Sequence, residues 1–144
     1  MKDTVEPMSY ETLQPSLYTH LGQTHQMMAQ LGLDPTLSTL LELRASQINQ
    51  CEFCVNMHLA HARKIGVSQD KLDQLVVWRH AHVFSEAERA ALAWTEAMTY
   101  LDRGCDFALL RADLLSHFSD AEVSLITADI GMINLWNRVQ RSKY

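Results

Sequence analysis

Two cysteines and a histidine at helical spacing are the residues of this chain best suited to chemistry. Cys54 follows Cys51 by three positions, and His58 follows Cys54 by four. Both spacings bring side chains together across adjacent turns of an α helix. An imidazole beside a thiol can accept its proton, and a second thiol one turn away can resolve a mixed intermediate. The pattern therefore predicts a redox-active dithiol with Cys51, Cys54 and His58 as catalytic residues.

The expected start of this helix favours the thiolate form of a cysteine. We expect Asn49 to cap the helix, with Glu52 at the third helical position to complete a capping box. Cys51 would then lie in the first turn, where the helix dipole stabilises a negative charge.

Zinc binding is the main competing interpretation, because His61 completes a set of two cysteines and two histidines. Cys51 and His61 are ten residues apart, which is about 15 Å along a continuous helix. Four side chains spread over that length cannot surround one ion, so we expect no metal here. A third interpretation, in which the cysteines and His58 are inert core residues, stays open.

Composition indicates a folded protein of one domain, residues 1–144. Hydrophobic residues make up 47% of the chain and charged residues 20%, which is ordinary for a globular protein. The net charge of -5 and the lack of any Lys-rich or Arg-rich run argue against nucleic-acid binding. No apolar stretch approaches the roughly 20 residues that span a bilayer, so we expect no membrane partner.

The beginning of the sequence and the cysteine count both favour the cytoplasm. Residues 1–7 are too polar to open a secretory signal. Cys105 makes the number of cysteines odd, which fits a reducing compartment better than a disulfide framework. We interpret Cys105 as structural, and His61, His80 and His82 as surface or packing residues.

Helical periodicity runs through nearly the whole chain and predicts an all-α fold of about six to seven helices, with the CxxC at the start of a central helix. Gly32 and Gly66 should end helices, Asp34 and Pro35 should begin one, and Ser68 should begin another. Ser85 with Glu88 and Ser119 with Glu122 form two further capping boxes. The expected helices cover residues 13–31, 36–47, 49–65, 68–76, 87–100 and 121–141.

Four segments in the right order resemble the alkylhydroperoxidase D-like (AhpD-like) proteins of the carboxymuconolactone decarboxylase family. They are Leu33 to Pro35, Glu42 to Cys54 with His58, Phe84 to Trp94, and Asn134 to Arg138. The resemblance implies an AhpD-like helical bundle that assembles into homo-oligomers, commonly trimers or hexamers. It also implies CxxC-based peroxide reduction or thiol-disulfide exchange. By that resemblance Cys54 pairs with His58, and Cys51 is the resolving partner.

Two positions depart from the family pattern. Peroxidatic members place a glutamate where this chain has Thr39, and many place a histidine where it has Phe53. A threonine hydroxyl cannot act as a base near neutral pH, so the family's proton relay is incomplete and peroxide reduction should be slow. Glu42 lies one helical turn after Thr39 and is our candidate to replace part of the missing carboxylate.

The expected mechanism is nucleophilic thiol chemistry without an organic cofactor. His58 takes the proton of Cys54, the thiolate attacks a peroxide oxygen or a disulfide sulfur, and Cys51 closes the disulfide. The chain has no GxGxxG fingerprint, so electrons should come from an external thiol or dithiol.

Two functions of other classes remain as alternatives. One is a decarboxylase or lactone-processing enzyme of the wider family, whose members of that kind generally lack the CxxC. The other is a noncatalytic oligomeric module whose cysteines sense oxidation. In either case we expect subunits to bury apolar helix faces between them, such as those of Leu37, Leu40, Leu41 and Trp136.

Overall fold

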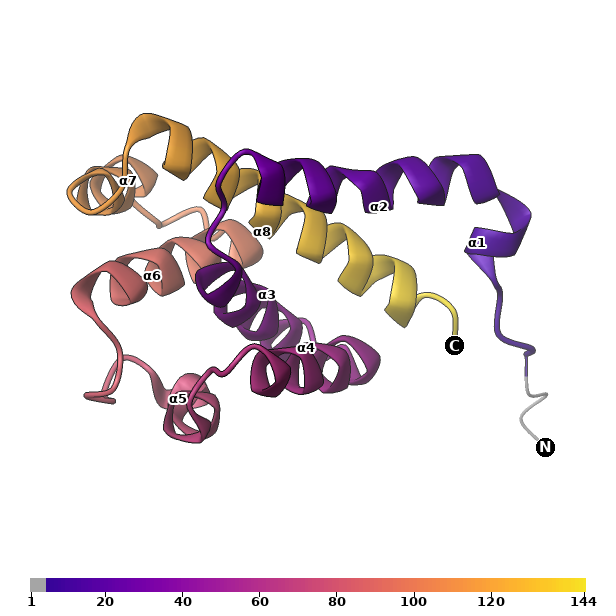
Figure 1. The fold of residues 1–144 in the computed structure, drawn as a ribbon, viewed down its shortest axis with the longest axis horizontal. Coiled ribbons are helices and arrows are strands. Elements are labelled where there is room, and N and C mark those ends of the chain that lie inside the picture. The colour runs from indigo at the N-terminus through magenta and orange to yellow at the C-terminus, as the bar shows by residue number, and fades with distance from the viewer. Residues whose placement is uncertain (1–4) are drawn as a thin grey trace.

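The computed structural model describes residues 5–144, and in this part of the chain all regular structure is helical (Figure 1). The fold class is therefore confirmed. Eight α helices and one 3-10 turn occur here, which exceeds the six to seven helices expected. In chain order they are α1 (Tyr10–Leu13), α2 (Pro15–Gln30), α3 (Pro35–Ile48), α4 (Glu52–Lys64), α5 (Gln69–Gln74), the 3-10 turn η1 (Leu75–Val77), α6 (Glu86–Tyr100), α7 (Phe107–Leu115) and α8 (Asp120–Arg141).

Helix α3 is the centre of the arrangement. It packs against α4, α6 and α8, and Figure 1 shows it in the middle of the molecule. Helices α2 and α8 lie along one side, while α6 and α7 lie at the end away from the two termini (Figure 1). A residue on α3 can therefore contact side chains from several helices that are distant in sequence.

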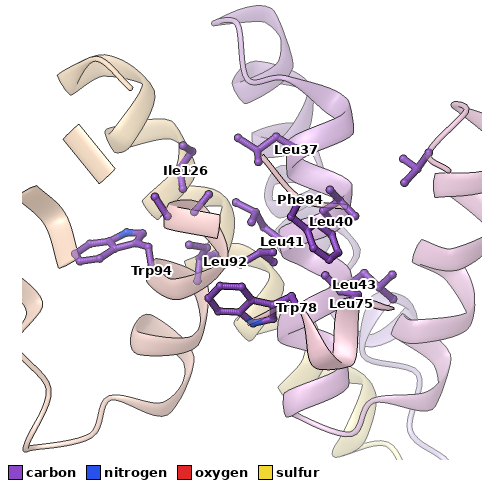
Figure 2. Packing of buried hydrophobic residues seen from close by; sticks show 14 of the residues in the cluster. Leu37, Leu40, Leu41, Leu43, Leu75, Trp78, Phe84, Leu92, Trp94 and Ile126 are labelled. Carbon is purple, nitrogen blue, oxygen red and sulfur yellow. The ribbon is translucent and has the colours of Figure 1, made fainter. Parts of the chain in front are cut away.

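The hydrophobic core forms around the leucines of α3. Leu40, Leu41 and Leu43 are at most 1% exposed, and they meet side chains from α6, α8 and the segment between α5 and α6 (Figure 2). Leu37 is also buried in this cluster. The prediction that Leu37, Leu40 and Leu41 are available to a second subunit is therefore wrong, because the chain's own helices cover them.

Polar caps begin four of the helices, α3, α5, α6 and α8, at the expected residues. Asp34 accepts a hydrogen bond from the backbone N–H of Thr36, with Pro35 as the first residue of α3. Ser119 and Glu122 form a complete capping box at α8. At α6 only half of the expected box forms, because the Glu88 carboxylate pairs with Lys71 at 2.6 Å instead of turning back to the cap.

One expected helix was broken and one helix was missed. The first helix is broken at Gln14, whose φ of -134° is not helical, because a residue that precedes proline is pushed out of the α region. Helix α7 was missed, although Asp106 caps it by accepting from the N–H of Leu109. Gly66, at φ 88°, follows α4 in the left-handed conformation that was expected. Within residues 5–144, none of the helices combines the length and apolarity needed to cross a bilayer.

Candidate active site

The two cysteines lie where α4 begins, but the helix starts two residues later than the sequence indicated. Cys51 is the N-cap of α4, and its Sγ accepts from the backbone N–H of Cys54 at 3.4 Å. Cys51 and Cys54 are joined as a disulfide, with Cα atoms 5.3 Å apart. Both side chains are at most 2% exposed. The pair therefore stands at the start of a central helix, as predicted.

Asn49 does not cap α4, and Glu52 is its first rather than its third residue. Asn49 instead ends α3, and its side-chain N–H₂ donates to the amide oxygens of Asn134 and Asn137 on α8, each at 2.9 Å. Gln50 follows in the left-handed conformation with φ 53°. This turn separates α3 from α4 and leaves Cys51 to cap the new helix.

His58 is held inside the protein by a carboxyl group of the neighbouring helix. Its side chain is 8% exposed, and its Nδ1 lies 3.3 Å from Oε2 of Glu42 on α3. Burial, and then electrostatic repulsion from the imidazoles of His61 and His25, lowers the pKa of His58 to about 4. The imidazole is thus neutral near pH 7, and the contact with Glu42 is not an ion pair in the resting protein.

The contact with Glu42 also decides which nitrogen of His58 is free. A neutral imidazole carries one N–H, and Nδ1 is the nitrogen that faces the carboxyl group. The other nitrogen, Nε2, is buried and has no hydrogen-bond partner among the described residues. We therefore assign the proton to Nδ1, which leaves the Nε2 lone pair able to accept a proton.

Glu42 is the centre of a polar cluster that the sequence pattern did not reveal. Its Oε1 lies 3.7 Å from Nδ1 of His25 on α2. Asp129 of α8 is the third member of the cluster: a ring nitrogen of His25 and one carboxyl oxygen each of Glu42 and Asp129 lie within 4.8 Å of one another. Burial, and then the negative charge of Asp129, raises the pKa of Glu42 well above its usual range. Burial also raises the pKa of Asp129.

A hydrogen bond from Trp136 argues against a metal ion in this cluster. The indole N–H of Trp136 donates to Nε2 of His25 at 2.7 Å, and an indole nitrogen can only donate. Nε2 must therefore accept, so the proton of a neutral His25 sits on Nδ1. That nitrogen faces Glu42 and has no lone pair left for a cation. The three side chains form a proton-holding cluster rather than a ligand set.

These groups line one cavity of about 680 Å³ beside α4. Cys54, His58 and Glu42 all face it, whereas Cys51 does not line it. Most of the remaining surface is apolar. His25, His61, Asp129 and Trp136 also line the cavity. The other lining residues are Met28, Ala29, Leu33, Pro35, Ser38, Thr39, Phe53, Met57, Ile133 and Gln140.

The structure brings the four predicted site residues together, since Glu42, Cys54 and His58 line the cavity and Cys51 is bonded to Cys54. Thr39 also lines the cavity, but its hydroxyl donates to the carbonyl of Pro35 at 2.8 Å. His61 is exposed, as predicted, and in addition lies at the cavity. His25 and Asp129 were missed because no spacing links them to the CxxC. They lie 26 residues before Cys51 and 78 residues after it.

The comparisons with known proteins agree with this fold. The sequence model of the carboxymuconolactone decarboxylase family matches residues 15–97. The chain belongs to the carboxymuconolactone decarboxylase family. The matched range contains Glu42, both cysteines and His58, and it ends before Asp129.

Individual relatives of this family member span nearly its whole length. The uncharacterized protein YdfG of Bacillus subtilis is 27% identical over 132 residues, 92% of this chain and 90% of its own. A solved structure is similar with a TM-score of 0.89 and 34% identity, covering 96% of this chain and 95% of that one. It is ATU0492 from Agrobacterium tumefaciens, a protein of unknown function with the suggested name antioxidant defence protein AhpD. This similarity places our chain among the AhpD-like members.

The fold also occurs in a more distant protein. The debrominase Bmp8, in a variant form solved with 2,3,4-tribromopyrrole, is similar with a TM-score of 0.80 over 99% of this chain and 90% of that one. At 18% identity this similarity shows the fold alone.

Proposed function

We propose that this protein is a thiol-dependent antioxidant oxidoreductase that reduces a peroxide or a disulfide through Cys54, His58 and Cys51. The observation that carries the proposal is the cavity in which Cys54 lies with His58, whose free Nε2 can accept a proton. Glu42 holds the other nitrogen at 3.3 Å. In this proposal Cys54 is the nucleophile, His58 is its base and Glu42 orients the base.

In the reduced protein His58 Nε2 takes the proton of the Cys54 thiol, and the thiolate attacks the peroxide. An S–O bond forms while the O–O bond breaks, and the departing oxygen takes a proton back from His58. Cys51 then attacks the sulfenic acid, so that water leaves and the Cys51–Cys54 disulfide closes. The two electrons that reduce the peroxide thus come from the two sulfurs.

With a disulfide substrate the same thiolate forms a mixed disulfide and releases one thiol, and Cys51 releases the second. In both cases an external thiol or dithiol must reduce the Cys51–Cys54 bond before the next turnover. The CxxC pair favours this reaction over decarboxylation or lactone processing, neither of which uses two electrons from a pair of sulfurs. The proposal also includes assembly into a homo-oligomer, which the family resemblance suggests has three or six chains.

Replacement of each cysteine in turn tests the roles. Cys54→Ser should abolish turnover with cumene hydroperoxide or a small aromatic disulfide. Cys51→Ser should react once and then accumulate a sulfenic acid or mixed disulfide at Cys54, visible by mass spectrometry. Cys105→Ser is the matched control, because Cys105 is a free cysteine outside this cavity. Equal single-turnover reactivity in the Cys51 and Cys54 variants would contradict the assignment, and inert thiols in the native protein would support a noncatalytic module.

A further inference from the structure

Asp129 is the most deeply buried carboxyl group at the cavity. It is 0% exposed, and its Oδ2 accepts from the hydroxyl of Ser38 at 2.7 Å. Its Oδ1 is buried and has no hydrogen-bond partner among the described residues, and a carboxyl oxygen of Asp129 lies within 4.8 Å of one of Glu42. A charged oxygen without a partner is costly in the interior. A proton between Glu42 and Asp129 would remove that cost.

Among the described residues at the cavity, no lysine or arginine neutralises the two carboxyl groups. His25 faces them from α2, and His58 and His61 face the cavity from α4. None of the described residues that line the cavity is a lysine or an arginine. Two adjacent carboxylates would therefore carry two negative charges with no permanent cation beside them, and such pairs hold on to one proton.

We propose that Asp129 shares a single proton with Glu42, and that the pair presents one negative charge to His58 throughout the thiol reaction. Asp129 is in this sense a positioning residue, since it acts on His58 through Glu42. The kinetic part of this inference rests on the proposed function, whereas the sharing of the proton does not.

The second carboxyl group changes what a buried glutamate can do. A single carboxyl group in this apolar cavity would take up a proton and become neutral, so it would offer no charge to an imidazolium. In a pair, the O–H of one group stabilises the charge of the other, and Ser38 adds a further donor. One negative charge then persists at neutral pH.

The proton count stays balanced during turnover. When Cys54 gives its proton to Nε2, His58 becomes an imidazolium whose Nδ1–H points at Glu42. The carboxyl pair keeps its one proton and its one negative charge, and the imidazolium later returns its own proton to the departing oxygen or sulfur. The pair thus stabilises a transient cation without being consumed.

Carboxyl titration of the oxidised protein tests the shared proton directly, because the disulfide does not titrate. With ¹³C-labelled Glu and Asp side chains, NMR of the native protein should show two well-separated titration steps for Glu42 and Asp129. In Asp129→Asn the Glu42 carboxyl should titrate in one step between them, moved by about one pH unit or more from either wild-type step. Glu42→Gln should do the same for Asp129. A Glu42 titration that is unchanged in Asp129→Asn would overturn the proposal.

Two further variants control for folding and for general charge effects. Ser38→Ala removes one hydrogen bond to Asp129 and should raise the first titration step. If the buried Asp129→Asn variant does not fold, this result tests the proposal in its place. Asp120→Asn, at an exposed position on the same helix, should change neither step. A native protein without any protonated side-chain carboxyl group near pH 7 would also overturn the proposal.

The effect of the carboxyl pair on the reactivity of Cys54 is measured with the reduced protein. The rate of Cys54 alkylation by iodoacetamide should fall on the acid side at a pH about one unit or more higher in Asp129→Asn than in the wild type. A shifted titration with an unshifted rate profile would overturn the link to His58. Cys54 that is unreactive in the wild-type protein would instead contradict the proposed function and leave the titration result standing.

Discussion

The carboxyl group of Glu42 contacts the imidazole of His58, although Glu42 lies sixteen residues earlier in the sequence. The contact exists because α3 and α4 pack side by side, which brings the carboxyl group within 3.3 Å of Nδ1. Thr39, one turn earlier on α3, also reaches the cavity, but its hydroxyl is bonded to the backbone. The structure therefore places Glu42, and not Thr39, in contact with Nδ1 of His58.

This geometry changes the expected outcome of substitutions on α3. Glu42→Gln should lower the reactivity of Cys54 by a factor on the order of 10², since a positioned acid-base group contributes about that much. Thr39→Glu should give no gain, because the Nδ1 of His58 already faces a carboxyl group. Stopped-flow peroxide reduction with each reduced variant measures both effects. A large gain from Thr39→Glu would mean that Glu42 does not replace the family's glutamate.

Much of this site could be predicted from residues that are close in sequence. Cys51, Cys54 and His58 were predicted from their spacing along one helix. Glu42 was predicted because it lies one turn from Thr39. His25 and Asp129 could not be found in this way. Their nearness to Glu42 depends on how α2 packs against α8 and how α8 packs against α3, and a local sequence pattern does not reveal such packing.

The turn between α3 and α4 is the element that sets the position of the CxxC. Asn137 of α8 is 1% exposed; it accepts from Asn49 at 2.9 Å and donates to the hydroxyl of Ser46 at 3.0 Å. Arg141 donates to the carbonyl of Asn49 at 3.0 Å. These bonds fix the end of α3 against α8, so the chain can leave α3 at Gln50 and restart at Cys51.

Loss of this anchor should weaken the whole fold. Asn137→Ala removes a buried amide that bonds to both Asn49 and Ser46, and we expect the free energy of unfolding to fall by about 2 kcal/mol. Urea unfolding followed by circular dichroism measures the change. Asn56→Ala, at an exposed position on α4, is the control and should have little effect. Similar losses in both variants would show that the network does not anchor the turn.

The same anchor explains why the helix start was predicted wrongly while the helix itself was found. Asn49 is a good capping residue by type, and Glu52 stands at the right distance from it. The side chain of Asn49 instead reaches α8, a contact between residues 85 and 88 positions apart. The capping box of Ser119 with Glu122, whose partners are local, was predicted correctly.

At the scale of the whole molecule, none of the exposed large apolar side chains of the described residues lies on α3, and α2 and α4 are among the helices that carry them. Leu17, Met27 and Leu31 are between 53% and 65% exposed, and they lie toward one side of α2 and its end. Phe53 and Met57 on α4 are about half exposed and also line the cavity. Burial of such residues between subunits would remove apolar area from water.

We therefore expect the homo-oligomer to form through α2. Light scattering at micromolar concentration should give three or six times the chain mass, and the double variant Leu17→Glu and Met27→Glu should shift the protein toward the monomer, because charges in an apolar interface lose their hydration. Gln26→Glu adds a charge at an exposed position that points away from both Leu17 and Met27 around the same helix and should leave the mass unchanged. A wild-type monomer at this concentration would refute the assembly, while an oligomer insensitive to the double variant would place its interface elsewhere, with α4 and the rim of the cavity as the next surface to substitute.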